Sequence, residues 1–216
     1  KLSNFIDIYK ILKAEIYFNQ GKLDEALDIL FEFKDIKNDK NGNKKIRINI
    51  LIANIFIKQK RFNESEKILL DLIKQFNNVQ LAYLNLSVLY SSKNELKKAI
   101  KILKEGIKSY PSYLPFHKNL ATFYRNTGQI DLAINTNLFI ISKNKFDYSS
   151  YYELSDMYDF DKHNDELNFL LNTNINSLNP FGKINAGFAM SNIYHKQKDY
   201  KKSSFYLKIA NDVSLK

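Results

Sequence analysis

The sequence predicts an all-α protein in which about six helix-turn-helix hairpins are stacked one on the next. Three observations support this prediction. An aromatic residue recurs at intervals close to 34 residues, and a small residue lies three positions before it. In most of these segments another small residue lies nine positions after the aromatic. The hydrophobic fraction of 44%, which includes 14 Tyr and 16 Phe, is large enough for a packed core.

A frame of 34 residues makes the first pattern explicit. Two of its positions, the eighth and the eleventh, are filled by the expected type of residue in all six repeats. The eighth position holds Ala14, Ala53, Ser87, Ala121, Ser155 and Ser191. The eleventh position holds Tyr17, Phe56, Tyr90, Tyr124, Tyr158 and Tyr194. Agreement this regular is far beyond what chance produces at this composition.

The twentieth position of the frame is small in five of the six repeats. It holds Ala26, Ser65, Ala99, Ala133, Leu167 and Ser203. Small side chains at positions 8 and 20 allow the two helices of a hairpin to approach closely, and the aromatic at position 11 fills the space beside that contact. Position 24 is Leu except at Asn137, which also agrees with a helical hairpin.

The repeats can be placed in order along the chain, as one array over residues 1–216. They are expected at residues 7–40, 46–79, 80–113, 114–147, 148–181 and 184–216. Five additional residues after the first repeat fall in the polar stretch 37–45, which indicates a surface loop. Pro111 and Pro180 lie near the ends of the third and fifth repeats, where proline stops a helix. The fifth repeat departs most, with Leu167 and Asn174 at positions 20 and 27, so its second helix is expected to be irregular.

This pattern resembles the tetratricopeptide repeat, a helix-turn-helix unit of 34 residues, over nearly the whole chain. The resemblance implies a right-handed superhelical solenoid of about six repeats, whose concave wall is lined by the first helix of each repeat. One departure concerns position 4, which is often Trp in the family. Here it holds Lys10, Asn49, Tyr83, His117, Tyr151 and Gly187, and the chain contains no Trp.

In the family, positions 2, 5, 6, 9, 12 and 13 face the concave groove. In repeats one to three these positions are mostly apolar: Ile8, Ile11, Leu12, Phe18, Ile50, Leu51, Ile57, Leu81, Leu84 and Val88, interrupted by Glu15, Arg47, Asn54, Lys58 and Asn85. Large exposed apolar patches are uncommon on monomers. A partner's amphipathic helix, a second copy of the chain or an N-terminal segment of its own is therefore expected to cover the groove. The alternative is that the curvature of the superhelix buries these residues.

Repeat four presents a polar wall at the same positions, and repeat five adds Glu153, Asp156 and Asp159. A basic zone beside an acidic one suits a charged peptide, although solvated side chains on a helix produce the same pattern. Asn85 and Asn119 share position 6, and in some family members such an amide grips a peptide backbone because it donates and accepts at once. The predicted peptide-binding residues are Leu12, Arg47, Leu51, Asn54, Leu84, Asn85, Lys118, Asn119, Thr122, Arg125 and Asn126.

The sequence contains no motif for catalysis or for binding a metal or cofactor. Because there is no Cys, thiolate catalysis and Cys-ligated zinc are excluded. His117, His163 and His195 lie far apart, and none has a second His or a carboxylate in a metal-binding spacing. No glycine-rich phosphate loop occurs. We therefore expect that the chain by itself is not an enzyme and uses no cofactor.

The net charge of +10 comes almost entirely from Lys, since Arg occurs only at 47, 61 and 125. A chain rich in Lys, Asn and Ile has the composition that an AT-rich genome favours, so no specific nucleic-acid partner is expected. No apolar run reaches the roughly 18 to 20 residues that span a bilayer, so no membrane span is expected. The compartment stays open, with the cytoplasm favoured.

The stretch Lys183–Asp212 resembles the repeat that immediately precedes the catalytic domain in bacterial proteins that fuse tetratricopeptide repeats to a sulfotransferase. The catalytic domain of that family uses the sulfuryl donor PAPS, and this chain contains nothing of its phosphate site. No polar capping helix follows the last frame, so the array is expected to continue or to be covered by a partner. Three interpretations remain open: a peptide-binding scaffold, the substrate-recruiting region of a larger enzyme, and a homo-oligomer formed through the apolar half.

Overall fold

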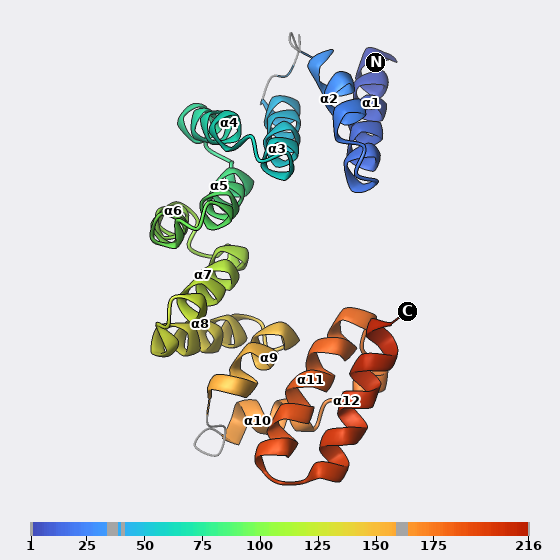
Figure 1. Ribbon diagram of the computed structural model, residues 1–216, viewed down its shortest axis with the longest axis vertical. Helices are drawn as coiled ribbons and strands as arrows, with labels where there is room; N and C mark the ends of the chain where they lie inside the picture. Colours follow the sequence, from blue (N-terminus) through green and yellow to red (C-terminus); the bar gives the residue numbers. More distant parts are fainter. Residues whose placement is uncertain (1, 34–38, 40–41, 159–163, 216) are drawn as a thin grey trace. The chain divides into compact units, whose positions relative to one another are not determined.

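The structure, a computed structural model, describes residues 2–33, 39, 42–158 and 164–215. Within these residues the chain is all-α, with twelve α-helices, one short 3-10 helix and no strand, which confirms the predicted fold class (Figure 1). The chain divides into two compact units, residues 1–113 and 114–216, and the boundary falls between the third and fourth predicted repeats. Each unit has apolar cores of its own.

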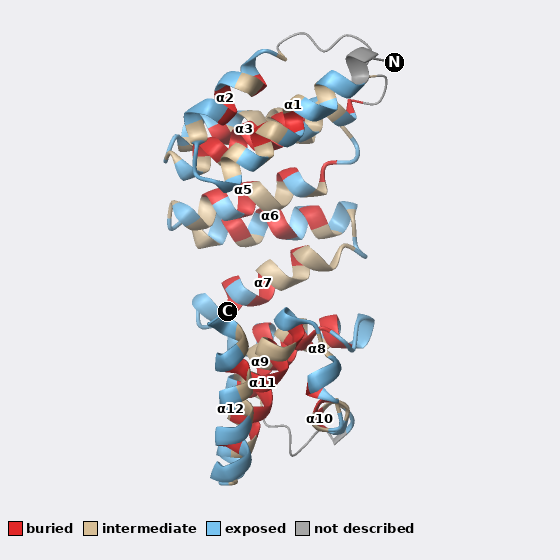
Figure 2. Cartoon of the chain, turned by 90° about the vertical axis from the view of Figure 1, so that its right-hand side faces the viewer, coloured by how far each residue is buried: buried red, intermediate tan, exposed pale blue. Residues whose placement is uncertain are grey.

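Unit 1 consists of three helical hairpins. They are α1 (Leu2–Asn19) with α2 (Leu23–Phe31), α3 (Asn43–Lys58) with α4 (Phe62–Gln75), and α5 (Gln80–Ser92) with α6 (Leu96–Ser109). The first helix of each later hairpin packs on both helices of the hairpin before it. Of the expected loop 37–45, residues 43–45 belong to α3, and most of the rest lies outside the described residues. Buried and exposed residues alternate around α5 and α6, as expected for helices with one packed face (Figure 2).

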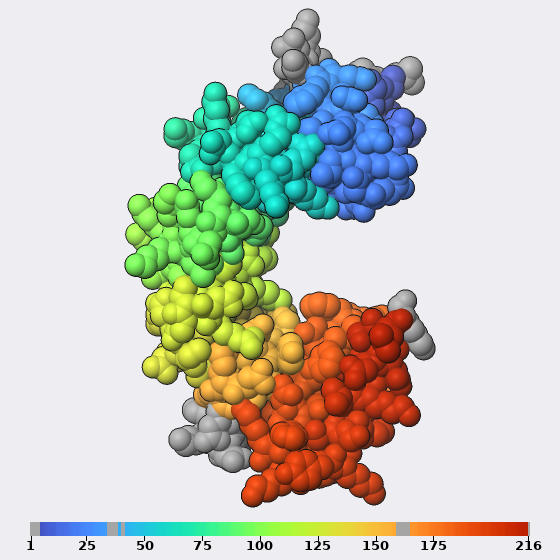
Figure 3. Space-filling view, viewed as in Figure 1, coloured from blue at the N-terminus to red at the C-terminus, as the bar shows by residue number. Residues whose placement is uncertain are grey.

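Unit 2 also consists of three hairpins, and the middle one is irregular. The elements are α7 (Leu114–Asn126), α8 (Ile130–Lys143), α9 (Tyr148–Met157), α10 (Asn164–Leu171), the 3-10 helix η2 (Ile175–Ser177), α11 (Pro180–Lys196) and α12 (Tyr200–Ser214). The short α10 is followed by η2, which confirms the expectation of an irregular second helix in the fifth repeat. The last hairpin is regular, and α11 and α12 form a close-packed body, orange and red in Figure 3.

A contact between small residues at positions 8 and 20 holds five of the six hairpins together, whereas the fifth has Leu167 at position 20. All six residues at position 8 are buried, as are all six at position 20. In the second hairpin the hydroxyl of Ser65 donates a hydrogen bond to the backbone carbonyl of Ala53, at 2.9 Å. In the sixth the hydroxyls of Ser191 and Ser203 lie 3.2 Å apart. Larger side chains at these positions would separate the helices, so the predicted role of the small residues is confirmed.

The turn inside the hairpin has the same conformation in five of the six repeats. A residue with φ between 59° and 77° stands at position 15, namely Gly21, Lys60, Asn94, Gly128 and Lys198. The next backbone N–H donates to the carbonyl of the aromatic at position 11, with N–O distances of 2.8–2.9 Å. This closure is the Schellman motif, which satisfies a free carbonyl at the helix end. The corresponding turn of the fifth repeat lies outside the described residues.

Two helices of unit 2 differ sharply in burial. About half of α11 is buried, whereas α12 buries only Ser203 and Ala210 and exposes its outer side (Figure 2). Gly187, at position 4, allows the two helices to approach closely. A Cβ atom there would lie 3.0 Å from the Cβ of Ala210 and 3.1 Å from the carbonyl oxygen of Tyr206. The large aromatic that the family often carries at position 4 cannot fit at this contact.

Candidate binding groove and polar networks

Unit 1 contains a groove of about 480 Å³ between α1, α3 and the start of α5. Its floor is apolar, because Ile50, Leu51 and Val79 are buried beneath it. Ile46 and the exposed Leu81 extend the apolar surface at its sides. Polar groups complete the lining: Glu15, Asn43, Arg47, Asn54, Asn78 and Gln80. The groove therefore offers a largely apolar seat surrounded by hydrogen-bonding groups.

One α3 face supplies most of this site. Residues 47, 50, 51 and 54 follow one another at helical spacing, so they point to the same side of α3. Three of them, Arg47, Leu51 and Asn54, are predicted peptide-binding residues. The structure therefore brings together three predicted residues, and it adds the segment from Asn78 to Leu81 to the lining.

Arg47 is held by Glu15 in a two-point ion pair. Its Nε and Nη2 atoms each donate to one carboxylate oxygen of Glu15, both at 2.7 Å. Hydrogen bonding to Glu15 raises the pKa of the Arg47 guanidinium. This fork links α1 to α3 across two repeats and leaves little free charge for a ligand. Arg47 therefore shapes one side of the groove more than it attracts an anion.

Unlike the Arg47 guanidinium, the amide of Asn54 has no partner among the described residues. Its side chain is half-buried at the groove, and within the described residues no hydrogen bond of the amide occurs. Asn85, one turn beyond Leu81 on α5, does not line the groove, but it is also half-buried, and its amide has no hydrogen bond within the described residues. An amide that is unpaired in the free protein can donate to and accept from a ligand without first breaking an internal bond.

The predicted apolar wall of repeats one to three divides into two groups. Leu12, Leu81 and Val88 are exposed, and Leu84 is half-buried. Ile11, by contrast, is buried in the core between α1, α2 and α3, so its expected place on the groove wall is wrong. Ile11 packs there in one cluster with Leu27 of α2 and Ile48 of α3.

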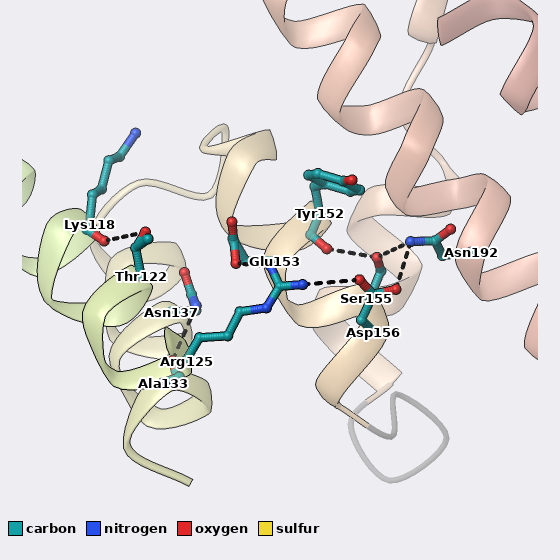
Figure 4. A network of polar contacts seen from close by, with 10 residues as sticks. All are labelled: Lys118, Thr122, Arg125, Ala133, Asn137, Tyr152, Glu153, Ser155, Asp156 and Asn192. Atoms are coloured by element: carbon teal, nitrogen blue, oxygen red, sulfur yellow. Dashed lines mark hydrogen bonds and ion pairs between the residues drawn. The ribbon is translucent and has the colours of Figure 1, made fainter. Parts of the chain in front are cut away.

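In unit 2 the predicted basic and acidic zones neutralise each other. Arg125 of α7 pairs with Glu153 of α9 at 2.8 Å and reaches Asp156 at 3.6 Å. From the other side, Asn192 of α11 donates to Asp156 at 3.0 Å, and the Lys196 ammonium donates to the Asp156 backbone carbonyl. Figure 4 shows Arg125 and Asn192 converging on α9 from the two neighbouring helices. These contacts tie the first helices of three successive repeats together.

Lys118 is also engaged within unit 2. Its ammonium pairs with the carboxylate of Asp147, which is buried and also caps the N-terminus of α9 by accepting from the backbone N–H of Ser150. Burial by itself would raise the pKa of Asp147. Hydrogen bonds from Lys118 and Ser149 and the Lys118 charge outweigh it, so the pKa lies below its ordinary value. Asp147 therefore stays ionised and holds Lys118 in place.

The other predicted residues of repeat four lie at the surface. The hydroxyl of Thr122 donates to the backbone carbonyl of Lys118 at 3.2 Å, a local bond within α7. Asn126 is exposed and Asn119 half-buried, and in the described part of the chain neither amide has a hydrogen bond. Asp159, expected in the acidic zone, lies outside the described residues.

Two of the histidines contact aromatic rings. The centroid of the His117 ring lies 4.6 Å from that of Phe139, and the ring of the exposed His195 lies 5.5 Å from that of Tyr200. His163 lies outside the described residues. Where the structure describes the chain, no group of three or more His, Asp or Glu side chains is placed to hold a metal ion. None of its described helices is long and apolar enough to cross a bilayer.

Residues 6–129, more than half of the chain, match the family model described as the tetratricopeptide repeat protein 21 ARM repeat. The chain belongs to this tetratricopeptide repeat family. The predicted family is therefore confirmed. The match ends at residue 129, so the resemblance of Lys183–Asp212 to sulfotransferase fusions stays a prediction. A comparison with curated protein sequences finds no significant match.

Solved structures show the same fold. PilF from Pseudomonas aeruginosa superposes with a TM-score of 0.65 at 12% identity, over 95% of this chain and 90% of that one. The protein TTC0263 from Thermus thermophilus superposes with a TM-score of 0.58 at 15% identity, over 94% and 98%. A MamA RS-1 double mutant reaches 0.55 at 13% identity, over 79% and 94%. At these identities the likeness concerns the fold of this tetratricopeptide repeat chain alone.

Sequence reasoning missed the partners of the predicted basic residues. Glu15 was expected only as an interruption of an apolar wall, yet it holds Arg47. Glu153 and Asp156 were expected to face a ligand, yet they hold Arg125. The available signal was that basic and acidic residues alternate between the first helices of neighbouring repeats, which places opposite charges side by side.

Proposed function

We propose that this chain is a non-catalytic protein-interaction scaffold and that the groove of unit 1 holds a peptide or helix of a partner protein. The observation that carries the proposal is the combination of a buried apolar floor at Ile50, Leu51 and Val79 with the unpaired amide of Asn54 above it. Stacked repeats offer extended surfaces of this kind for binding. Membership of the repeat family supports the same conclusion.

The charges of the groove indicate how a ligand would be recognised. Arg47 and Glu15 neutralise each other, so the charge of a ligand contributes little. An apolar side chain seated over the floor supplies the affinity, and the Asn54 amide fixes the ligand by hydrogen bonds to its backbone. Because Lys118 and Arg125 are engaged in ion pairs, we assign binding to unit 1 and a structural role to these two residues of unit 2.

A peptide-display selection tests this proposal. The chain is panned against a random peptide library, and the selected peptides are measured against Leu81→Asp and Asn54→Ala. Both positions are partly exposed, so both variants are expected to fold. Leu81→Asp should weaken binding by about tenfold or more, and Asn54→Ala by a smaller factor. The matched control is Asn63→Ala on the exposed face of α4, which should leave affinity unchanged.

Salt dependence provides the second arm of the test. Raising the salt concentration should change the affinity little, because the expected ligand is held by apolar contacts and amide hydrogen bonds. Selected peptides rich in acidic or basic residues, with binding that salt abolishes, would contradict the proposal. Full binding by both groove variants would contradict it as well.

A further inference from the structure

The first helix of unit 1 carries an exposed apolar stripe on the side opposite its core. Phe5, Tyr9, Leu12 and Ile16 are 72%, 64%, 45% and 54% exposed. Their spacing of four, three and four residues places them in one row along α1. The buried Ala14 lies on the opposite side of the helix. Such a row of large apolar side chains in water is the kind of patch that marks an interaction site.

The other repeats show what normally covers this row. Tyr9 and Ile16 occupy positions 3 and 10 of the repeat. In α3, α5 and α11 these two positions hold buried apolar residues: Ile48 and Ile55, Ala82 and Leu89, and Ala186 and Ile193. The fifth repeat differs, with the buried Ser150 and the half-buried Met157. Each of the three apolar pairs belongs to an apolar cluster that includes the second helix of the preceding hairpin. Positions 3 and 10 are thus the docking face for a second helix.

The covering helices share one feature. Each contributes two leucines three residues apart to the cluster: Leu27 and Leu30 from α2, Leu69 and Leu72 from α4, and Leu167 and Leu170 from α10. Residues at this spacing lie on one face of a helix. The chain therefore contains three internal examples of the interface, each with a Leu-x-x-Leu helix against positions 3 and 10.

We propose that the α1 stripe is a docking site for an amphipathic Leu-x-x-Leu helix of a partner protein, which packs as the second helix of a preceding hairpin would. Three charged residues of α1 are already in ion pairs: Asp7 with Lys44 at 2.7 Å, Lys10 with Glu32 at 2.5 Å and Glu15 with Arg47 at 2.7 Å. The Lys13 ammonium lies over the Tyr17 ring. Binding at this site is therefore driven by apolar contact. This site is separate from the groove, and the proposal does not depend on the function proposed for the groove.

A second copy of the chain is a poorer occupant. Outside α1, the exposed large apolar residues of the described chain include no pair three positions apart on one helix. On α12, for example, Phe205 and Leu207 are two apart and point to different sides. A second copy could offer only its own α1, which carries bulky aromatic residues where the covering helices carry leucine.

The test uses a fluorescent peptide with the sequence of α4, Phe62–Gln75, because α4 covers the equivalent positions of α5. Free helices of this length are marginal in water. A side-chain staple between positions 63 and 67, both exposed in the protein, keeps the peptide helical. The control peptide carries Leu69→Ser and Leu72→Ser. Binding is measured by fluorescence anisotropy at constant salt concentration.

The protein variant is the double substitution Tyr9→Ser, Ile16→Ser, which changes only exposed side chains. The α4 peptide should bind the unmodified chain at least about tenfold more tightly than it binds this variant. The control peptide should show the same loss against the unmodified chain. Phe205→Ser, an exposed apolar change on α12, and the groove variant Asn54→Ala should bind the α4 peptide normally. Far-UV circular dichroism verifies that every variant is folded.

Three results would overturn the proposal. The first is equal binding of the α4 peptide to the double variant. The second is equal binding of the control peptide to the unmodified chain. The third is a dimer of the unmodified chain in sedimentation that Tyr9→Ser, Ile16→Ser dissociates, since a second copy would then occupy the stripe. Because Asn54→Ala tests the groove alone, failure at one site is distinguished from failure at the other.

Discussion

The first and last hairpins are built on the same repeat but present different surfaces. In the first hairpin, positions 3 and 10 are Tyr9 and Ile16, both exposed. In the last, the same positions are Ala186 and Ile193, both buried against the hairpin before it. The difference shows that an apolar residue at these positions is compatible with either condition. What decides its burial is whether a second helix lies against it.

The second helix of the last hairpin also differs from the second helices of earlier hairpins. Position 28 is Ile in four repeats, at 73, 107, 141 and 175, but it is the exposed Asn211 in α12. Ser204 and Lys208, also on α12, are exposed as well. The exposed surface of α12 is nevertheless mixed, because Phe205 and Leu207 are exposed on the same helix.

The largest effect is expected at position 4, where the two hairpins differ most. Gly187→Leu places a side chain against Ala210 and the Tyr206 backbone, and should destabilise unit 2 by about 2–3 kcal/mol. The matched change Lys10→Leu, on the surface of the first hairpin, should alter stability by less than about 0.5 kcal/mol. Urea unfolding followed by circular dichroism measures both. Equal effects would mean that the two hairpins are packed alike.

An intermediate effect is expected in the turn at position 15. Gly21 and Lys198 both have positive φ, 77° and 62°, which costs a residue with a side chain more than it costs glycine. Lys198→Gly should therefore raise the free energy of unfolding by roughly 0.5–1 kcal/mol, and Gly21→Ala should lower it by roughly 1 kcal/mol. Thermal unfolding of the two variants provides the measurement. A loss of stability in Lys198→Gly would contradict the turn assignment.

The smallest effect is expected at the N-cap of the second helix. Asp199 caps α12 by accepting from the backbone N–H of Lys202 at 3.1 Å, whereas Lys22, at the same position of the first hairpin, does not cap α2 with its side chain. Lys22→Asp should therefore stabilise the protein at neutral pH by about 0.5 kcal/mol. Asp199→Ala should lower the melting temperature.

Acid should remove both of these effects. The hydrogen bond from the Lys202 backbone, followed by the contact with its side chain, lowers the pKa of Asp199. A carboxylate with a lowered pKa in the folded state stabilises the protein fully above its unfolded pKa of about 3.9. That stabilisation is lost as the pH falls through the lower folded pKa. Melting temperatures of wild type and Asp199→Ala should therefore converge in acid, and a difference that persists there would show that the carboxylate is not responsible.

Much of the fold could be predicted because the residue types at fixed positions of the repeat show where its helices make contact. Small residues at positions 8 and 20 mark the closest approach of two helices, and the Ser65–Ala53 and Ser191–Ser203 contacts lie where they were expected. The turn conformation was harder to predict from the sequence. Lys60 and Lys198 adopt a left-handed conformation that glycine usually marks, so the residue type did not reveal the turn.

The candidate site could be predicted only in part. The apolar face of α3 follows from helical spacing, and Leu51 and Asn54 lie at the groove as expected. The pairing of Arg47 with Glu15 does not follow from spacing, because the two residues lie 32 positions apart on different hairpins. Whether such a residue faces a ligand or a neighbour depends on the rotation of one helix against the next.

The sequence by itself determined the hairpin, its period and its family, since these depend on local spacing and on the size of side chains at fixed positions. Only the tertiary structure decided which apolar residues are covered and which charges are free. Ile11 is buried and Leu12 exposed although they are neighbours on one helix. Arg125 is engaged because α9 places two carboxylates beside it. Burial and pairing are properties of the stack, because the neighbouring hairpin supplies the surface on which both depend.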